Sequence, residues 1–309
     1  MPSPLIKRSL WTAAGLLAAG GLTYLYASRV ENRRYKIERV NVITGVPEGD
    51  NEAPGEGVTF KVLHLSDSHL SRPETHKIEF LKRVTDEDFD LIVFTGDIFE
   101  NYSGMEYATR IITRRPRLGA YAVLGNHDYY DYSWMNKTVG KFYRRWRHPR
   151  QKRDVQPMID ALADGGIKVL RNESVSLANE HLHLVGLDYP GVSEAELVRL
   201  TSTAPENAMV MCLLHLPRKL DKLPRAGVDI AFGGHTHGGQ IRIPGIGALI
   251  TDSELPRKEA SGLIWRGDTA IHISRGIGAD PKTDFRLFCP PAATIVTIKH
   301  FPAKKTAHS

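Results

Sequence analysis

Short apolar runs rich in β-branched residues recur along this chain and alternate with amphipathic segments. The runs have the length and composition of buried strands and lie at residues 60–65, 91–95, 121–124, 209–214 and 230–232. Amphipathic periodicity predicts helices at residues 75–86, 105–114, 155–164 and 194–203. Further strands are expected at residues 35–45, 262–265, 270–274 and 293–299. Alternating strands and helices followed by a β-rich part predict a mixed α/β domain.

The N-terminal segment differs from the rest because it carries no charge between Arg8 and Arg29. Residues 9–28 have the length of a helix that spans a bilayer. Trp11 lies near one end and Tyr26 near the other, as interfacial anchors do. We expect a retained transmembrane helix, with a cleaved signal peptide as the alternative. Basic residues flank both ends of this segment. The excess of basic residues after it would place the following domain in the cytoplasm, whereas the signal-like layout would place the domain outside.

The remaining composition is that of an ordinary globular protein. The 309 residues include 41 Lys and Arg against 35 Asp and Glu, which gives a net charge of +6. Two cysteines provide no disulfide framework. The expected organisation is a short basic N-terminus, the anchor, a juxtamembrane strand and linker, one large domain and a basic tail. These five parts cover residues 1–8, 9–28, 29–58, 59–299 and 300–309.

Each of the five apolar runs listed first is followed by a polar motif with metal-binding side chains. The motifs are Asp67-Ser68-His69, Gly96-Asp97, Gly125-Asn126-His127-Asp128, His215 and Gly234-His235-Thr236-His237. Loops at the carboxyl ends of strands in an α/β sheet converge on one site. Imidazoles, carboxylates and a carboxamide together suit two adjacent divalent metals that share a carboxylate. The pattern therefore predicts a metal centre suited to hydrolysing phosphate esters.

The five motifs resemble those of the calcineurin-like metallophosphoesterase family. The fifth continues as Gly238-Gly239-Gln240, which is similar to the bacterial membrane-associated or exported branch with a His-Gly-Gly-Gln motif. The family tail also fits at Ser274-Arg275-Gly276-Ile277-Gly278 and Arg286-Leu287, whereas Pro290-Pro291-Ala292 lacks the usual acid. The resemblance covers residues 59–299 and implies two facing mixed β-sheets flanked by helices.

Carried over to this sequence, the resemblance implies a role for each motif residue. Two divalent ions, Mn, Fe or Zn, would be bound by two ligand sets that share Asp97. The sets are Asp67, His69, Asp97 and His237 for one metal, and Asp97, Asn126, His215 and His235 for the other. His127 would contact the substrate phosphate and protonate the leaving oxygen. Asp128 would orient the His127 imidazole.

The predicted function is a membrane-anchored dinuclear-metal phosphoesterase that cleaves a phosphodiester or pyrophosphate by metal-activated water. The substrate would be lipid-linked or nucleotide-linked. The alternatives are a phosphomonoesterase or protein phosphatase, and a non-catalytic, membrane-tethered phosphate-binding module. His64, Cys212 and Cys289 are expected to be buried packing residues, so no thiol nucleophile is invoked.

A cluster of basic and aromatic residues at 141–153 follows the third motif. It is either a solvated surface segment or a flap that attracts an anionic substrate or an anionic membrane surface. Nucleic acid ranks last as a partner, because the sequence contains no recognised nucleic-acid module. The oligomeric state is left open by the sequence.

Overall fold

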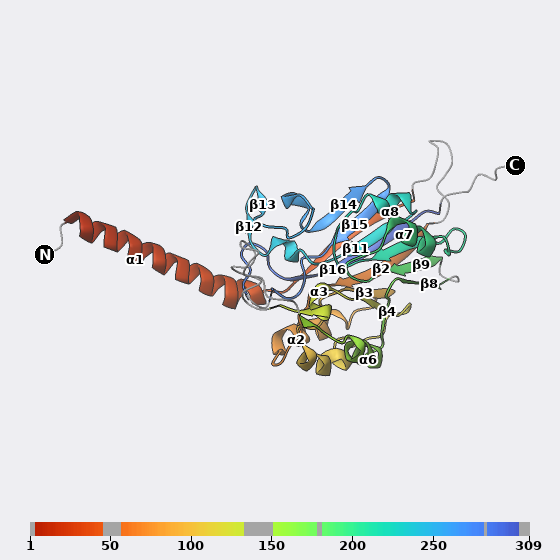
Figure 1. Ribbon diagram of the computed structural model, residues 1–309, viewed down its shortest axis with the longest axis horizontal. Helices are drawn as coiled ribbons and strands as arrows, with labels where there is room; N and C mark the ends of the chain where they lie inside the picture. The colour runs from red at the N-terminus through yellow and green to blue at the C-terminus, as the bar shows by residue number, and fades with distance from the viewer. Residues whose placement is uncertain (1–3, 46–56, 133–150, 178–180, 281–282, 303–309) are drawn as a thin grey trace.

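The computed structural model describes residues 4–45, 57–132, 151–177, 181–280 and 283–302, with side chains from residue 11 onward. The first element, α1 (Pro4–Leu25), is a long helix that projects from the body of the molecule (Figure 1). A π-helical turn (Tyr26–Val30) and a 3-10 turn (Glu31–Arg33) connect it to the first strand. All other elements belong to the body.

Two six-stranded mixed sheets form the body and face each other (Figure 1). The first has the order β1 (Lys36–Thr44), β16 (Ala292–His300), β2 (Val58–Leu65), β3 (Leu91–Thr95), β4 (Ala120–Val123), β7 (Ile167–Val169). The second has the order β14 (Gly262–Arg266), β15 (Thr269–Ile273), β11 (Ile230–Gly233), β10 (Met209–Leu213), β9 (Leu182–Gly186), β8 (Glu173–Leu177). The predicted α/β fold with two mixed sheets is confirmed.

Parallel pairing places the carboxyl ends of the motif-bearing strands at common sheet edges. In the first sheet β2, β3, β4 and β7 are parallel neighbours. In the second sheet β9, β10, β11 and β15 are parallel, and β14 and β8 are antiparallel edge strands. Two antiparallel strand pairs lie outside the two sheets, β5 (Tyr130–Asp131) with β6 (Gln151–Lys152), and β12 (Arg242–Ile243) with β13 (Gly247–Ala248).

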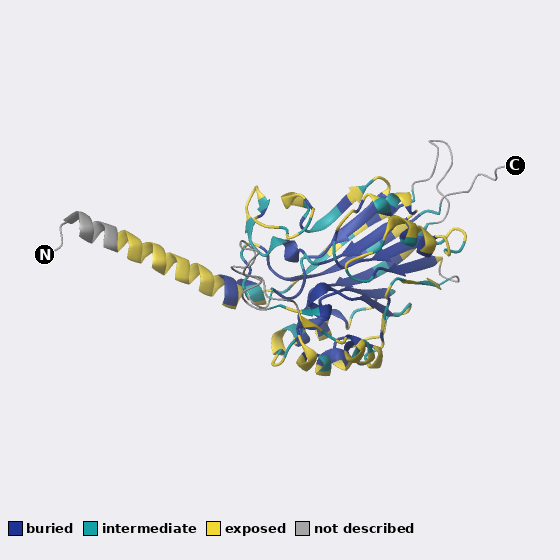
Figure 2. Cartoon of the chain, in the orientation of Figure 1, coloured by how far each residue is buried: buried dark blue, intermediate teal, exposed yellow. Residues whose placement is uncertain are grey.

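The apolar core has three layers that follow from alternation along the strands. Phe60 and Val62 of β2 belong to the cluster between the two sheets, whereas Leu63 and Leu65 belong to the cluster under the helices. The helices on the first sheet are α2 (Thr75–Val84), α6 (Gln156–Asp164) and the 3-10 segment η3 (Tyr102–Arg110). The helices α7 (Glu194–Thr201) and α8 (Lys222–Arg225) pack on the second sheet over a third cluster. Burial is accordingly continuous through the body (Figure 2).

One predicted α-helix takes another form. Residues 105–114 were expected to be α-helical, but the structure has the 3-10 helix η3 nearby. The Asn101 side chain accepts a hydrogen bond from the Ser103 amide (3.0 Å) and so caps its first turn. Gly104 lies so close to Leu70 that an added Cβ would be 2.1 Å from the Leu70 carbonyl oxygen. This close packing against the first motif loop is a tertiary contact, and the periodicity of the sequence carries no information about it.

The predicted transmembrane helix is not supported. Among the residues that the structure describes, no helix combines the length and apolar character needed to cross a membrane. Gly15, Gly20 and Gly21 contribute little apolar area to α1. The segment just after α1 is instead joined to the body, where Ala27 is buried and its carbonyl oxygen accepts a hydrogen bond from the Arg286 amide (3.2 Å).

Candidate metal centre

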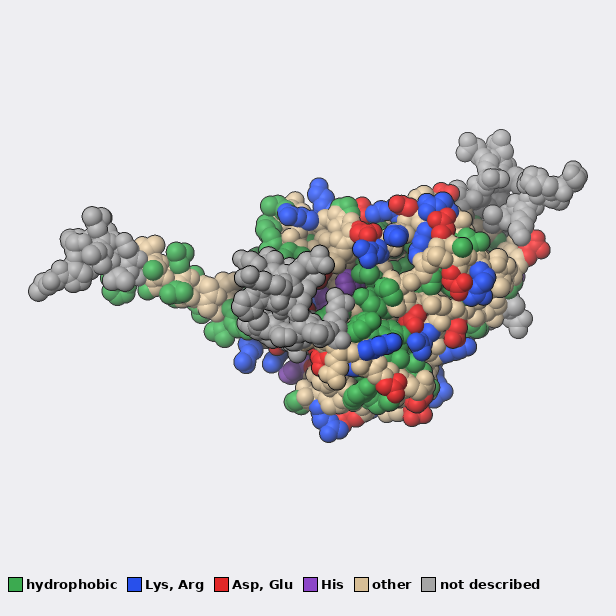
Figure 3. Space-filling model, in the orientation of Figure 1, with side chains coloured by type: hydrophobic (Ala, Val, Ile, Leu, Met, Phe, Trp, Pro, Cys, Tyr) green, Lys and Arg blue, Asp and Glu red, His purple; other side chains and the backbone are tan. Residues whose placement is uncertain are grey.

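The five polar motifs lie at the carboxyl ends of β2, β3, β4, β10 and β11, as the sequence predicts. Backbone hydrogen bonds link the first two motif loops, from Asp67 N to Gly96 O (3.0 Å) and from His69 N to Asp97 O (2.9 Å). Gly234 N donates to His215 O (3.0 Å) and links the last two. In Figure 3, histidine side chains reach the surface near the middle of the molecule. The motifs therefore converge on one site.

Five of the predicted ligands have a backbone conformation that is rare outside glycine. The φ angles of Asp67, His69, Asp97, His235 and His237 are 49°, 43°, 51°, 70° and 51°. Left-handed conformations of such residues cost free energy and occur at functional sites, where the surrounding structure imposes them. Here they turn the side chains sharply off the strand ends and toward one another.

Glycines in the motifs allow the loops to approach these side chains. A Cβ on Gly125 would lie 2.2 Å from Asp97 Oδ1. A Cβ on Gly234 would lie 2.0 Å from Ser66 Oγ and 2.6 Å from Asp67 Oδ2. Any larger residue at either position would therefore displace a predicted ligand.

The first predicted ligand set is assembled around Asp67, His69 and His237. One ligand atom from each lies within 4.8 Å of the others. Asp67 Oδ1 is 3.7 Å from His237 Nε2, and His69 Nε2 is 3.3 Å from His237 Nε2. Two imidazole nitrogens and a carboxylate oxygen at these separations could hold a divalent transition metal.

The second set is assembled around Asp97, His215 and His235, again with ligand atoms within 4.8 Å of one another. Asn126 Oδ1 joins them, at 3.0 Å from His215 Nε2 and 2.9 Å from His235 Nδ1. Asp97 Oδ2 lies 3.4 Å from His215 Nε2 and 3.8 Å from His69 Nε2. The Asp97 carboxylate thus stands between the two sets, as a shared ligand would.

The ring nitrogens that face away from the site have acceptors for their protons. His215 Nδ1 lies 2.7 Å from Thr95 O, and His237 Nδ1 lies 3.0 Å from Gly278 O. A main-chain carbonyl can only accept, so each Nδ1 carries the proton and each Nε2 lone pair points into the site. Such outer contacts fix the tautomer that a metal ligand needs.

Arg286 explains why the tail motif belongs to this site. Its guanidinium is fully buried and donates to the carbonyl oxygens of Gly278 (2.5 Å), Arg275 (2.7 Å) and His237 (3.2 Å). The same Gly278 carbonyl accepts from His237 Nδ1. Arg286 therefore holds in place the tail carbonyl that orients the His237 ring.

Burial shifts the protonation of the ligands in a way that favours a cation. It raises the pKa of Asp67, and that of Asp97 well above its usual value. It lowers the pKa of His215, that of His237 well below its usual value, and that of His235 to about 3. Neutral imidazoles are what a metal binds, and a divalent cation stabilises the enclosed carboxylates in ionised form. The donor set therefore fits a metal centre.

Glu100 is a site residue that the sequence reasoning missed. Its Oε2 lies 2.9 Å from His127 Nδ1 and 3.1 Å from His69 Nδ1. Burial alone would raise the pKa of Glu100, but the hydrogen bonds from His127 and His69 reverse this and lower it below its usual value. One carboxylate thus orients both a predicted ligand and the predicted proton donor. The available signal was an acid three residues after Asp97, in the loop that follows β3.

Asp128 does not make the contact predicted for it. Its carboxylate accepts from the backbone amides of Gly125 (2.8 Å), Asp97 (2.9 Å) and Phe99 (3.2 Å), so it shapes the loops rather than the His127 ring. The orienting contact to His127 comes from Glu100. The His127 imidazole is also close enough to His69 and Asp97 to complete a third ligand group.

The residues expected to be packing groups are buried. His64 pairs with His272 (Nδ1 to Nδ1, 2.8 Å) and with Thr95 Oγ1 (2.8 Å), neither of which is a predicted ligand. Cys212 and Cys289 are also buried. Burial raises the pKa of Cys212 to about 12, which removes it as a thiolate nucleophile.

Most of the predicted basic cluster, residues 141–150, lies outside the described residues. At its end, Arg153 Nη1 donates to the carbonyl oxygens of Glu100 (2.6 Å) and His127 (2.8 Å). The segment that follows the third motif therefore returns to the metal centre at Arg153.

The facing mixed sheets and the convergence of His, Asp and Asn side chains at strand ends define a metallohydrolase. Residues 60–239 match the model of the calcineurin-like phosphoesterase family, and the chain belongs to this family.

Curated relatives span nearly the whole chain. The metallophosphoesterase YkuE of Bacillus subtilis is 28% identical over 93% of both chains. The phosphodiesterase YaeI of Escherichia coli is 27% identical over 81% of this chain and 84% of its own. The UDP-2,3-diacylglucosamine pyrophosphatase LpxG of Chlamydia muridarum is 24% identical over 93% and 96%. Together with the site, these relatives identify the protein as a metal-dependent phosphoric ester hydrolase.

Proposed function

We propose that the protein is a dinuclear-metal phosphoesterase that cleaves a phosphodiester or a pyrophosphate linkage. The observation that carries the proposal is the position of Asp97. Its carboxylate forms one ligand group with His215 and His235, and it also lies 3.8 Å from His69 of the other group, Asp67–His69–His237. Mn, Fe and Zn all suit these imidazole and oxygen donors. When bound, such ions act as Lewis acids on the phosphate and activate water.

The residues of the chain supply the remaining chemistry. Asp97 Oδ1 accepts from the His127 amide (2.7 Å), so the shared carboxylate also places His127 beside the ligand groups. His127 would contact a phosphate oxygen and give its Nε2 proton to the leaving oxygen, while Glu100 holds Nδ1. Glu100 would stabilise the imidazolium before the transfer, as a carboxylate partner does.

The proposed substrate carries its phosphate on a lipid or a nucleotide, and the proposed location is a membrane surface. The name of LpxG supports the substrate, since LpxG is called a pyrophosphatase of a nucleotide-linked, diacylated sugar, and YaeI is called a phosphodiesterase, which supports diester cleavage.

A substrate panel tests the proposal. The full chain, stripped of metal and reconstituted with Mn, Fe or Zn, is assayed on bis(p-nitrophenyl) phosphate, p-nitrophenyl phosphate, a phosphopeptide and a nucleoside diphosphate-linked diacyl sugar. The proposal expects metal-dependent turnover with the highest kcat/KM on a diester or pyrophosphate. Preference for p-nitrophenyl phosphate or the phosphopeptide would instead establish a monoesterase or protein phosphatase. Phosphate binding without turnover would establish a non-catalytic module.

A further inference from the structure

A hairpin that follows the His237–Gly239 turn exposes aliphatic side chains to solvent. It consists of β12, β13 and the residues up to 250. Ile243, Ile246, Leu249 and Ile250 are exposed to 39%, 52%, 42% and 50%. Several exposed aliphatic residues within eight positions form an apolar surface, which on a monomeric protein commonly marks an interaction site. We call these four residues the aliphatic hairpin surface.

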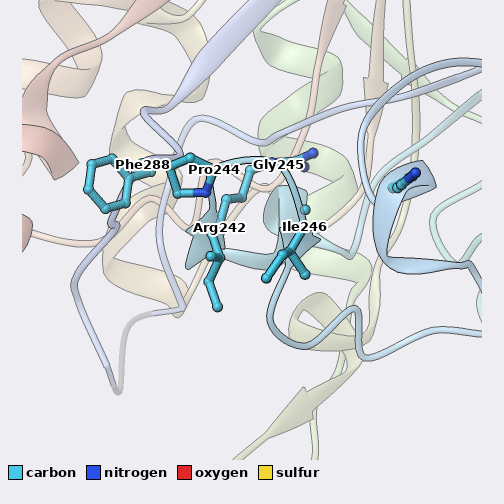
Figure 4. Close-up of a pocket in the computed structure, with 8 residues that line it drawn as sticks. Arg242, Pro244, Gly245, Ile246 and Phe288 are labelled. Atoms are coloured by element: carbon cyan, nitrogen blue, oxygen red, sulfur yellow. The ribbon is translucent and has the colours of Figure 1, made fainter.

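The surface continues onto the tail of the chain. Leu287 pairs with the base of the hairpin, through Arg242 N to Leu287 O (3.0 Å) and Leu287 N to Gln240 O (2.9 Å). The next residue, Phe288, is 57% exposed. An open cleft of about 340 Å³ is lined by Phe288 together with Pro244 and Ile246 of the hairpin (Figure 4).

Exposed charges of both signs lie beside this surface, since Asp252 and Glu254 follow Ile250, but the charges at the cleft are positive. Both charged residues that line the cleft are basic, Arg242 and Lys258. Arg242 Nη1 is held by Gly238 O and Ser261 Oγ (both 3.1 Å), whereas Lys258 is exposed and follows the exposed Arg257. Figure 3 shows apolar and basic side chains together over the region where Figure 1 labels β12 and β13.

We infer that the aliphatic hairpin surface docks on a bilayer that contains anionic phospholipids. Aliphatic side chains flanked by cations match the acyl boundary and the head-group phosphates that lie above it. The hairpin begins directly after the turn that carries His237, so docking would bring the metal centre to the head-group level. The four residues of this surface lie outside α1, and the inference goes beyond the proposed hydrolysis.

The test reads the environment of the hairpin itself. Ile246→Cys is labelled with a polarity-sensitive fluorophore in the full chain, and buried Cys212 and Cys289 limit labelling elsewhere. The matched control is Val198→Cys on α7, where the native residue is 43% exposed. Both proteins are mixed with phosphatidylcholine vesicles that contain or lack phosphatidylglycerol. The inference expects a blue shift and protection from aqueous iodide at residue 246 with anionic vesicles, and neither at residue 198.

Charge variants test the basic rim. Arg257→Gln combined with Lys258→Gln should weaken vesicle partitioning about tenfold to thirtyfold at low salt, since each cation near an anionic surface contributes about fivefold. The control Lys168→Gln, an exposed lysine on β7, should leave partitioning unchanged. High salt should reduce binding of the wild type toward that of the double variant.

Three results would overturn the inference. One is the absence of binding to anionic vesicles. The second is a label at residue 246 that stays open to iodide while the protein is vesicle-bound. The third is a blue shift without lipid that grows with protein concentration, which would mean that a second copy covers the hairpin. Hydrolysis of soluble bis(p-nitrophenyl) phosphate should be equal in all these variants, so failure of the docking idea is distinguishable from failure of the proposed function.

Discussion

Glu100→Gln should reduce activity although Glu100 belongs to neither ligand group. The change keeps the size of the side chain but removes the charge that accepts from His127 and His69. A hydrogen bond to an ionised group contributes about 1.5–3 kcal/mol. The Gln carbonyl oxygen can still accept from both imidazoles, as Glu100 Oε2 does, but a neutral acceptor binds each of them less strongly, so about 2 kcal/mol of orientation is lost. This corresponds to a fall of about 30-fold in kcat/KM, within the 10- to 100-fold loss typical of outer partners of a metal site.

The assay is kcat/KM for bis(p-nitrophenyl) phosphate across pH, together with metal content after dialysis. Metal should be lost more readily because His69 is no longer fixed. The pH profile should change, because the substitution removes the negative charge that accepts from His127 and His69 beside the reacting groups. A purely structural role for Glu100 would leave the profile unchanged. The exposed Glu79→Gln on α2 is the matched control. Activity within about threefold of wild type, with an unchanged pH profile, would refute the reasoning.

Further predictions concern the other site residues and the effect of pH. His127→Ala should keep its metal while kcat falls about 10²–10⁴-fold, less with an acidic leaving group; loss of metal would make His127 a ligand. Asp97→Asn should lose metal from both groups, as elemental analysis would reveal. Because burial raises the pKa of Asp97, the metal-free wild type should lose stability as pH rises from about 4 through that raised value, and Asp97→Asn should not; parallel thermal unfolding curves would contradict this. The lowered pKa of Glu100 has the opposite effect on stability. The contribution of Glu100 to folding stability is present above about pH 4.3 and should disappear on acidification through the folded pKa. Equal acid sensitivity of wild type and Glu100→Gln would count against this.

The convergence of the five motifs could be predicted from the sequence because two general rules act together, whereas the division into two ligand sets came from the family resemblance. Buried parallel strands are recognisable as β-branched runs, and their carboxyl ends converge. Asp67 and His235 are far apart in sequence, yet His235 N donates to Asp67 Oδ1 at 3.0 Å. The strand assignments alone were sufficient to place these two loops together.

Side-chain pairing between loops was harder to predict. Periodicity does not reveal whether an acid meets an imidazole or a backbone amide, and this decides between Glu100 and Asp128 as the partner of His127. The contacts of Arg286 with the carbonyl oxygens of His237 and Gly278 could not be predicted either, because they require the tail to pack against the loop that carries His237. The prediction of a transmembrane helix at residues 9–28 rested on the absence of charge, and no helix among the described residues has the length and apolar character to cross a membrane.

The central claim is that two metal ions share Asp97. Anomalous X-ray diffraction from crystals of the Mn-loaded protein would test it most directly. The account predicts two peaks, about 3.5–4 Å apart, on either side of the Asp97 carboxylate. One should lie among Asp67, His69 and His237, and the other among Asn126, His215 and His235. A single peak, or a peak bound by His69, Asp97 and His127, would contradict the account.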